Sequence, residues 1–169
     1  MKFTHALAAV VAVAAVAAAP AHASTTNWGV HDALEQGTGV YVGAGSQIND
    51  SFLFSLSAGS GLRTAASELD FLGADISNGK VSLYKEAGAT DTLIGSFSFD
   101  GTSPTFSNFG PLVAGSYYYM VTGVVTTGTP GGLYAISSTL APVPEPESLA
   151  LMLAGLGALG VVSRRRRQA

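Results

Sequence analysis

Between residues 24 and 141, apolar and polar side chains alternate in short runs separated by Gly, Asn, Asp and Ser. The segment DSFLFSLSAG is typical, because Phe52, Phe54 and Leu56 occupy every second position between turn-forming residues. Successive side chains of a strand point to opposite faces, so this pattern predicts strands with one buried face. No long run has the spacing of an amphipathic helix. The pattern therefore predicts an all-β body over 24–141, an antiparallel β-sandwich or jelly roll of about seven or eight strands.

Several elements can be placed along this body. An Asn-Gly pair at 78–79, a turn at 86–89 and a return over 93–99 predict a hairpin. Residues 117–122 and 133–140 predict two further strands. The start of the body, 24–45, is less regular, and residues 32–36 could form one helical turn. A body of about 120 residues can bury a core without covalent cross-links. The predicted core consists of Phe52, Phe54, Leu56, Leu69, Phe71, Leu83, Phe97, Phe99, Leu112, Tyr117, Tyr119, Val121 and Ile136.

The two ends of the chain have different patterns from the body. Residues 1–23 begin with Lys2, continue as an unbroken apolar stretch over 6–19, and end in the small-x-small sequence Ala21-His22-Ala23. These are the parts of a secretory signal peptide that the Sec machinery and signal peptidase recognise. We expect cleavage after Ala23, with Ala21 and Ala23 as the recognised small residues and Ser24 as the new first residue.

The C-terminal end has three parts. Residues 142–147 carry proline at every second position, which predicts a stiff, extended linker. Residues 148–163 contain 14 consecutive residues without a polar side chain. As a helix these span about 21 Å, less than the roughly 30 Å of a bilayer core. The flanking arginines of 164–169 nevertheless favour a single transmembrane helix with a basic cytoplasmic tail.

Charge and composition narrow the functional classes. The full chain has a formal charge of −3, but the body over 24–141 contains three basic and nine acidic residues. An acidic body with scattered cations is not expected to bind nucleic acid. The chain has no cysteine, so disulfides and thiol chemistry are excluded. Export without disulfides fits a bacterial envelope protein.

Candidate catalytic residues are few. The body has one histidine, His31, followed by Asp32 and Glu35, and imidazole next to carboxylate is a pattern of general bases and metal sites. We interpret His31 instead as a surface-loop residue near the new N-terminus. No Gly-x-Ser-x-Gly sequence is present. We therefore expect no enzymatic activity and no cofactor.

Binding residues are the alternative. Calcium needs several converging oxygen ligands, which could come from Asp50, Asp70, Asp75, Asp91 and Asp100. Their Gly, Asn and Ser neighbours are equally explained by turns. Of the three tyrosines at 117–119, strand alternation places two in the core and Tyr118 on the surface, where it could stack on a sugar. Only VTTGTPGG suggests the Thr-rich face of an ice-binding protein, which we regard as much less favoured.

The C-terminal sequence resembles a known sorting signal. Val143-Pro144-Glu145-Pro146, an apolar helix rich in Leu, Gly and Ala, and a final arginine cluster occur in the order of the PEP-CTERM signal of Gram-negative bacteria. The resemblance implies an exosortase as partner, with Pro144, Glu145 and Pro146 as its recognition element. It assigns Arg164, Arg165, Arg166 and Arg167 the role of a topological stop.

The body is similar to the FxDxF subfamily of PEP-CTERM proteins. The similarity lies in INDSFLFSL, ISNGKVSLY and LVAGSYYYMVTG; Asp50 and Phe52 match the second half of the motif, whereas Ile48 stands at the first Phe. Together, these features predict an exported protein, anchored transiently in the inner membrane and then carried to the cell surface or extracellular matrix. The resemblance implies a link to exopolysaccharide and biofilm. The alternative is a carbohydrate- or calcium-binding module.

Overall fold

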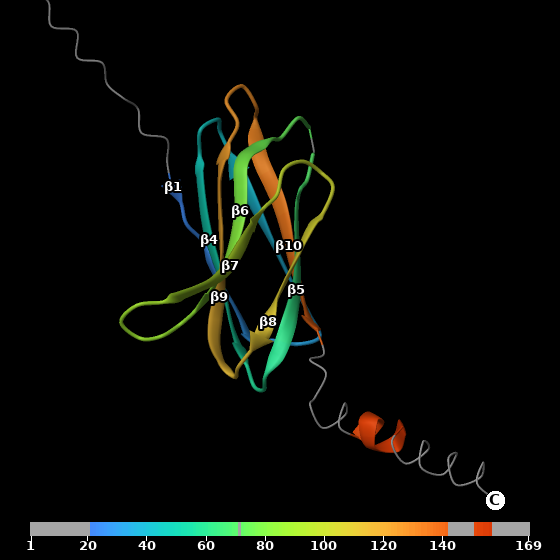
Figure 1. Cartoon of the computed structure of the whole chain (residues 1–169). Helices are drawn as coiled ribbons and strands as arrows, with labels where there is room; N and C mark the ends of the chain where they lie inside the picture. The colour runs from blue at the N-terminus through green and yellow to red at the C-terminus, as the bar shows by residue number, and fades with distance from the viewer. Residues whose placement is uncertain (1–20, 71, 142–150, 157–169) are drawn as a thin grey trace, which may run out of the picture.

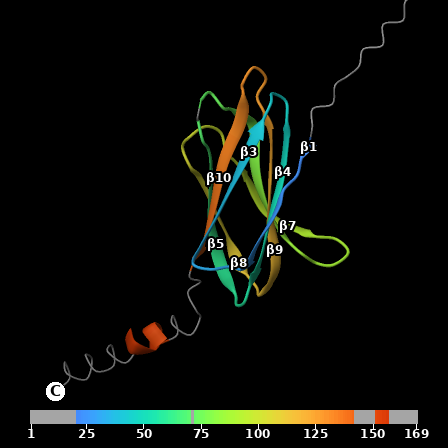
Figure 2. The same ribbon diagram turned by 180° about the vertical axis from the view of Figure 1, so that it is seen from behind.

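The computed structural model describes residues 21–70, 72–141 and 151–156. The body consists of β-strands packed in two sheets that face each other, as Figures 1 and 2 show from opposite sides. Nine strands have six or more residues, and a two-residue strand precedes them. The predicted β-sandwich is confirmed, with nine longer strands in place of the seven or eight predicted and with two parallel pairs among the predicted antiparallel ones. The strands are β1 (Ala21–His22), β2 (Thr25–Val30), β3 (Leu34–Val42), β4 (Gln47–Leu56), β5 (Ser60–Glu68), β6 (Ile76–Lys85), β7 (Thr92–Ser98), β8 (Thr105–Leu112), β9 (Gly115–Val125) and β10 (Gly131–Ala141).

The larger sheet has the order β1-β4-β9-β6-β7, and β2 also pairs with β4. Both β1 and β2 run parallel to β4, at Gln47–Ile48 and at 51–55 respectively. The smaller sheet has the order β3-β10-β5-β8, and all of its pairs are antiparallel. The connection between β6 and β7 is a hairpin whose loop projects from the sandwich in Figure 1. The strands from β2 to β6 instead alternate between the two sheets from one to the next.

The core lies between the sheets and follows the alternation of each strand. Ten of the thirteen predicted core residues are buried: Phe52, Phe54, Leu56, Leu83, Phe99, Leu112, Tyr117, Tyr119, Val121 and Ile136. Phe97 is partly buried against this core. Phe71 lies outside the described residues. The prediction for Leu69 is wrong, because its side chain is 38% exposed. Glu68 points inward at the end of β5, so alternation directs the next side chain outward.

Two local predictions need correction. Residues 34–36 belong to β3 and do not form a helical turn, because the segment pairs with β10 over nine consecutive residues. Gly37 and Gly39 permit this pairing, since a Cβ on them would lie 2.3 Å from the Phe52 ring and 2.2 Å from the Tyr134 ring. The hairpin at 76–99 is confirmed, but Asn78-Gly79 forms an irregularity inside β6 between Ser77 and Lys80. Asn78 has a φ of 56°, which this residue type tolerates better than most.

The ends of the chain are described only in part. Residues 151–156 are helical. Within the described ranges, no helix is long and apolar enough to cross a membrane. Most of the predicted signal peptide 1–23, the linker 142–147, most of the predicted span 148–163 and the tail 164–169 lie outside those ranges. These domain boundaries stay predictions.

Candidate functional site

The predicted sorting residues lie outside the part of the chain that the structure describes. They are Pro144, Glu145, Pro146, Arg164, Arg165, Arg166 and Arg167. Of the predicted cleavage site, Ala21 belongs to the short strand β1, and Ala23 leads from it toward β2. The candidate sites that can be described in atomic detail are therefore those of the body.

His31 lies in the core, which overturns its interpretation as a surface residue. Only 5% of its surface is exposed, and its ring meets Phe54 edge-on at a centroid distance of 5.1 Å. Its Nδ1 lies 2.6 Å from the Asp32 carbonyl oxygen, which can only accept, so Nδ1 carries the hydrogen. In a neutral imidazole with its hydrogen on Nδ1, Nε2 accepts a hydrogen bond from the Ser138 hydroxyl at 2.9 Å.

The histidine ends a chain of hydrogen bonds between the sheets. Because Ser138 donates to His31, its oxygen accepts from the Tyr119 hydroxyl at 2.9 Å, and Tyr119 accepts from the Thr64 hydroxyl at 2.6 Å. Burial raises the pKa of Tyr119 to about 12, so its hydroxyl stays protonated near pH 7, like the hydroxyls of Thr64 and Ser138. We call Thr64, Tyr119, Ser138 and His31 the neutral cluster. A histidine beside a serine resembles a nucleophile and its base. Ser138 is 0% exposed, however, so a substrate has no access to it.

Asp50 forms a second polar cluster in the core. The residue is 3% exposed and lies in the middle of β4, so turn chemistry does not explain it. Its Oδ1 accepts from the backbone N–H of Ser24 at 2.9 Å, and its other carboxylate oxygen accepts from the Tyr134 hydroxyl. The Tyr41 side chain also hydrogen-bonds to Asp50. Burial raises the pKa of Tyr41 and Tyr134 far above the ordinary value, and the bond to Asp50 raises it further. We call Asp50, Tyr134, Tyr41 and Ser24 the charged cluster.

The backbone approaches the charged cluster closely. A Cβ on Gly39 would lie 2.9 Å from an Asp50 carboxylate oxygen, so only glycine leaves room for the aspartate and Tyr134. A cavity of about 230 Å³ lies beside the carboxylate and is lined by Ala23, Ser24, residues 38–41 and Asp50. Asp50 is thus a buried acceptor that ties β4 to β10, to β3 and to Ser24 just before β2.

Glu68 is a further buried acid that the sequence analysis did not select. Its carboxylate accepts from the backbone N–H groups of Ile76 and Gly101. Burial is the main cause that raises the pKa of Glu68. The glutamate therefore fixes the loops at one end of the sandwich. Its position as the last residue of an alternating strand was a signal for an inward side chain.

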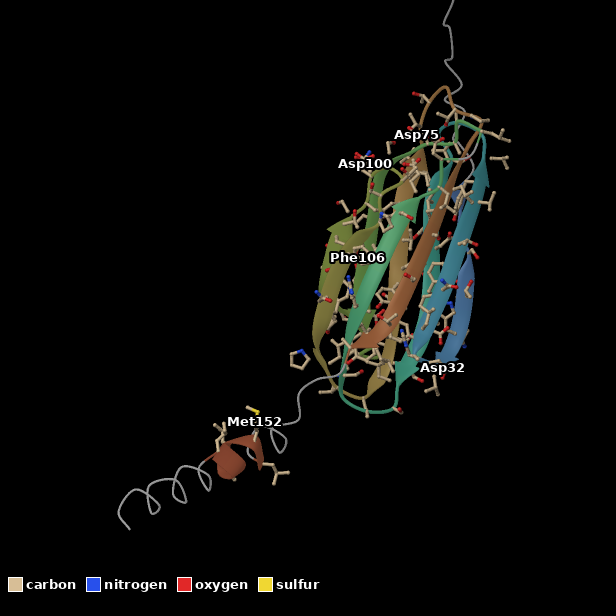
Figure 3. All side chains as sticks on the ribbon, turned by 90° about the vertical axis from the view of Figure 1, so that its right-hand side faces the viewer. Asp32, Asp75, Asp100, Phe106 and Met152 are labelled. Carbon is tan, nitrogen blue, oxygen red and sulfur yellow. The ribbon has the colours of Figure 1, made fainter. Side chains whose placement is uncertain are left out.

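The other acids proposed as calcium ligands do not form a metal site. Asp75 and Asp100 lie near one end of the sandwich, as Figure 3 shows, and Asp70 lines a shallow hollow with Glu68 and Asp75. Asp91 is exposed and accepts a hydrogen bond from the Tyr118 hydroxyl at 3.0 Å. Among the described residues, no three His, Asp or Glu side chains form a group that could hold a metal ion. VTTGTPGG spans the turn between β9 and β10, so it does not form a flat strand face.

The prediction for the three consecutive tyrosines is confirmed. Tyr117 and Tyr119 are buried, whereas Tyr118 lies on the outer side of β9. Its ring stacks on Tyr84 at 5.1 Å with an interplanar angle of 11°. One face of the Tyr118 ring is therefore already in use.

The outer face of the smaller sheet carries a shallow groove of about 330 Å³. Phe106, which is 55% exposed, stands on its β8 side in Figure 3. The Arg63 guanidinium lies over the Phe106 ring at 4.7 Å from its centroid. The lining combines small or apolar residues with hydroxyl and amide groups: Gln36, Gly37, Thr38, Ala65, Ala66, Ser67, Pro104, Phe106, Ala135, Ile136 and Ser137.

Solved structures share only a general likeness with this body. The pre-peptidase C-terminal domain of collagenase from Bacillus anthracis is 17% identical to this chain and superposes with a TM-score of 0.48. The match covers 71% of this chain and 97% of that domain. The Yersinia pseudotuberculosis-derived mitogen is 13% identical, with coverages of 68% and 92% and a TM-score of 0.40. The periplasmic inhibitor of g-type lysozyme from Aeromonas hydrophila is 16% identical, with coverages of 70% and 99% and a TM-score of 0.39. None of these likenesses supports a functional argument. No match was found among curated proteins.

The tail gives the specific comparison. Residues 142–167 match the family model of the PEP-CTERM protein-sorting motif. The match contains the Pro-Glu-Pro sequence, the apolar run and the four arginines that the sequence analysis singled out. It implies a chain that is exported, held at the membrane during sorting, and processed by an exosortase.

Proposed function

We propose that this chain is an exported bacterial protein whose C-terminal signal delivers a β-sandwich body to the cell surface or extracellular matrix. The observation that carries the proposal is the sorting-motif match over residues 142–167. In this function the chain is a Gram-negative surface protein linked to exopolysaccharide and biofilm. The tail anchors it transiently in the inner membrane, and exosortase then acts near Pro144, Glu145 and Pro146.

The rest of the chain supports this assignment. A cleavable leader would open the export route through the Sec machinery and signal peptidase. The body is acidic, so it has no electrostatic attraction to nucleic acid. The four arginines are concentrated at the end where a cytoplasmic stop is needed.

The same proposal assigns the body no enzymatic activity. The one histidine of the body is bonded to Ser138, and both are closed off from solvent in the core. A hydrolase would need these two groups to reach a substrate. Hydrolytic activity that disappears in His31→Ala would contradict this part of the proposal.

Processing of the tail tests the sorting function. The chain is produced in a Gram-negative host with and without its exosortase, and the surface-exposed protein is analysed by mass spectrometry. We expect the wild type to lose its C-terminal arginines only when exosortase is present. Replacing Pro144, Glu145 and Pro146 with alanine should leave the arginines in place, whereas the control Pro142→Ala should be processed. Recovery of surface protein that still ends in RRRRQA would refute the proposal.

A second candidate function is direct binding of polysaccharide by the body. The groove on the smaller sheet favours it, because hydroxyl and amide groups beside an exposed aromatic ring suit the polar edges and apolar faces of sugars. Arg63 beside Phe106 would suit an acidic sugar. The described residues offer no group of acids for calcium, so this candidate does not include the metal.

Binding of exopolysaccharide purified from the producing strain tests the groove. We expect Phe106→Ala to weaken binding about tenfold or more, since a buried aromatic contact contributes about 1–3 kcal/mol. Tyr118→Ala removes an aromatic side chain from the other sheet and serves as the matched control. Equal binding by both variants, or none by the wild type, would eliminate this candidate and leave the sorting function intact.

A further inference from the structure

The predicted leader cleavage falls beside a buried carboxylate. Cleavage after Ala23 makes Ser24 the first residue, and the nitrogen of Ser24 lies 2.9 Å from Oδ1 of Asp50. The carbonyl oxygen of Ser24 accepts from the Ser51 N–H at 2.8 Å. Both sides of the new first residue are therefore fixed to β4, on which Asp50 lies.

We infer that removal of the leader creates a partly buried ion pair between the α-ammonium of the exposed Ser24 and the buried Asp50 carboxylate, which stabilises the mature body. Hydrolysis adds the hydroxyl group of water to the Ala23 carbonyl carbon and a hydrogen to the Ser24 nitrogen. Near neutral pH the new amine takes up a further proton. A neutral amide donor then becomes a cationic donor to the same oxygen. The inference rests on the export route of the proposed function.

The surroundings of Asp50 favour this change. In the uncleaved chain the carboxylate accepts from a peptide N–H and two phenols, which are all neutral. Its desolvation is caused mainly by the fold itself, so a cation at Ser24 adds attraction to a carboxylate that is already buried. The amide bond to the ionised carboxylate is already charge-assisted, and a cationic donor at Ser24 adds the Coulomb attraction between opposite charges. The cavity beside Ser24 leaves space for water around the additional hydrogens.

The other titratable groups near Asp50 do not compete with the amine. Tyr41 and Tyr134 remain protonated, because burial raises their pKa. Glu68 lies opposite Tyr134 in the neighbouring strand, but its carboxylate binds the N–H groups of Ile76 and Gly101. His22 belongs to the predicted leader and leaves with it. The Ser24 amine is thus the group whose charge changes at cleavage.

The consequence is a body that gains stability when its leader is removed. In the precursor Ser24 is only an amide donor to the carboxylate, so the ion pair is absent while the chain must stay unfolded for export. The sign of the pH dependence follows from linkage. Pairing raises the folded-state pKa of the amine above its ordinary value, so its contribution is present below about pH 8 and is lost as the pH rises through the folded-state pKa.

The reactivity of the Ser24 amine tests the inference. The full chain is exported from a Gram-negative host, and its first residue is identified by mass spectrometry. Brief treatment with trace acetic anhydride then measures the free amine as a function of pH. We expect the chain to begin at Ser24 and its amine to react at pH 8 about tenfold more slowly than in Asp50→Asn. A different first residue, or equal rates in both proteins, would overturn the inference.

A one-residue insertion provides a test in which Asp50 is unchanged. Threonine placed between Ala23 and Ser24 moves the new amine by about 3.5 Å and leaves Ser24 as an amide donor. We expect the inserted amine to react at the rate of an ordinary α-amine. We also expect the wild type to melt at a higher temperature than the insertion variant near pH 7, and this difference to shrink toward about pH 10. Equal reactivity of wild type and insertion would refute the ion pair. Loss of export or of C-terminal processing would instead refute the proposed function.

Discussion

The sandwich buries two polar clusters that differ in how they end. In the neutral cluster, each hydroxyl of Thr64, Tyr119 and Ser138 donates once, and the chain ends at the Asp32 carbonyl oxygen through His31. In the charged cluster, the donors converge on one carboxylate that only accepts. Both clusters place polar atoms between two apolar sheets, and both give them partners.

The difference shows what each cluster can respond to. The neutral cluster is complete within the folded chain, so it specifies one arrangement of β5, β9 and β10. The charged cluster extends to Ser24 at the predicted processing site, so its energy depends on whether that nitrogen is an amide or an ammonium. A buried acid can therefore make stability depend on a covalent event, whereas a closed hydroxyl chain cannot.

Removing the acceptor should break the charged cluster with the largest effect. Asp50→Ala leaves the hydroxyls of Tyr134 and Tyr41 and the nitrogen of Ser24 without their acceptor. We expect a loss of about 3–5 kcal/mol in the free energy of unfolding, measured by chemical denaturation. Asp91→Ala is the matched control, because Asp91 also accepts from a tyrosine but is exposed. Similar losses in both variants would contradict the importance of burial.

Removing one hydroxyl from each cluster compares them directly. Tyr134→Phe deletes a donor to a carboxylate, and we expect a loss of about 1.5–3 kcal/mol in unfolding free energy. Tyr119→Phe deletes a link between neutral hydroxyls, for which we expect about 1 kcal/mol. Both substitutions remove one hydroxyl group, and both tyrosines are fully buried, so the two variants are matched in volume change and in burial. A greater loss for Tyr119→Phe would show that the neutral cluster, and not the charged one, dominates the core.

Glu68 offers a pH test of a buried acid bound by backbone amides. Burial raises its folded-state pKa, so its contribution is present below the unfolded-state value of about 4.3 and is lost as the pH rises through the folded-state pKa. We expect the stability of the wild type relative to Glu68→Gln to fall as the pH rises above about 4, as followed by thermal melting. A difference that stays constant over this range would contradict a raised pKa.

The sequence predicted the sandwich because alternation is a local property of each strand. Phe52, Phe54 and Leu56 were assigned to one buried face from their spacing alone, and they share it. Pairing order was not accessible in the same way, since most consecutive strands pair with partners distant in the sequence. The helical turn at 32–36 failed because pairing of β3 with β10 overrides the local preference.

The buried polar residues were the least predictable part of the body. His31 and Ser138 are 107 positions apart, and Asp50 and Tyr134 are 84 apart, so no local pattern joins them. Asp50 did alternate in step with Phe52 and Phe54, which is the signal for an inward acid. The sorting motif, in contrast, is a contiguous sequence, and the comparison with the family model agrees with its sequence assignment.

The smallest change in the free energy of unfolding is expected for the tyrosine–aspartate hydrogen bond on the surface, between Tyr118 and Asp91. The Tyr118 hydroxyl donates to Asp91 as the Tyr134 hydroxyl donates to Asp50, but water can replace the surface bond. Burial of the ring, with a further contribution from Asp91, raises the pKa of Tyr118 to about 12, so the hydroxyl remains a donor near pH 7. We expect Tyr118→Phe to change the free energy of unfolding by about 0.5 kcal/mol or less. A loss as large as that of Tyr134→Phe would mean that the tyrosine–aspartate bond stabilises the protein irrespective of its surroundings. A clearly larger loss for Tyr134→Phe than for Tyr118→Phe would instead show that the charged cluster stabilises the protein because it is excluded from water.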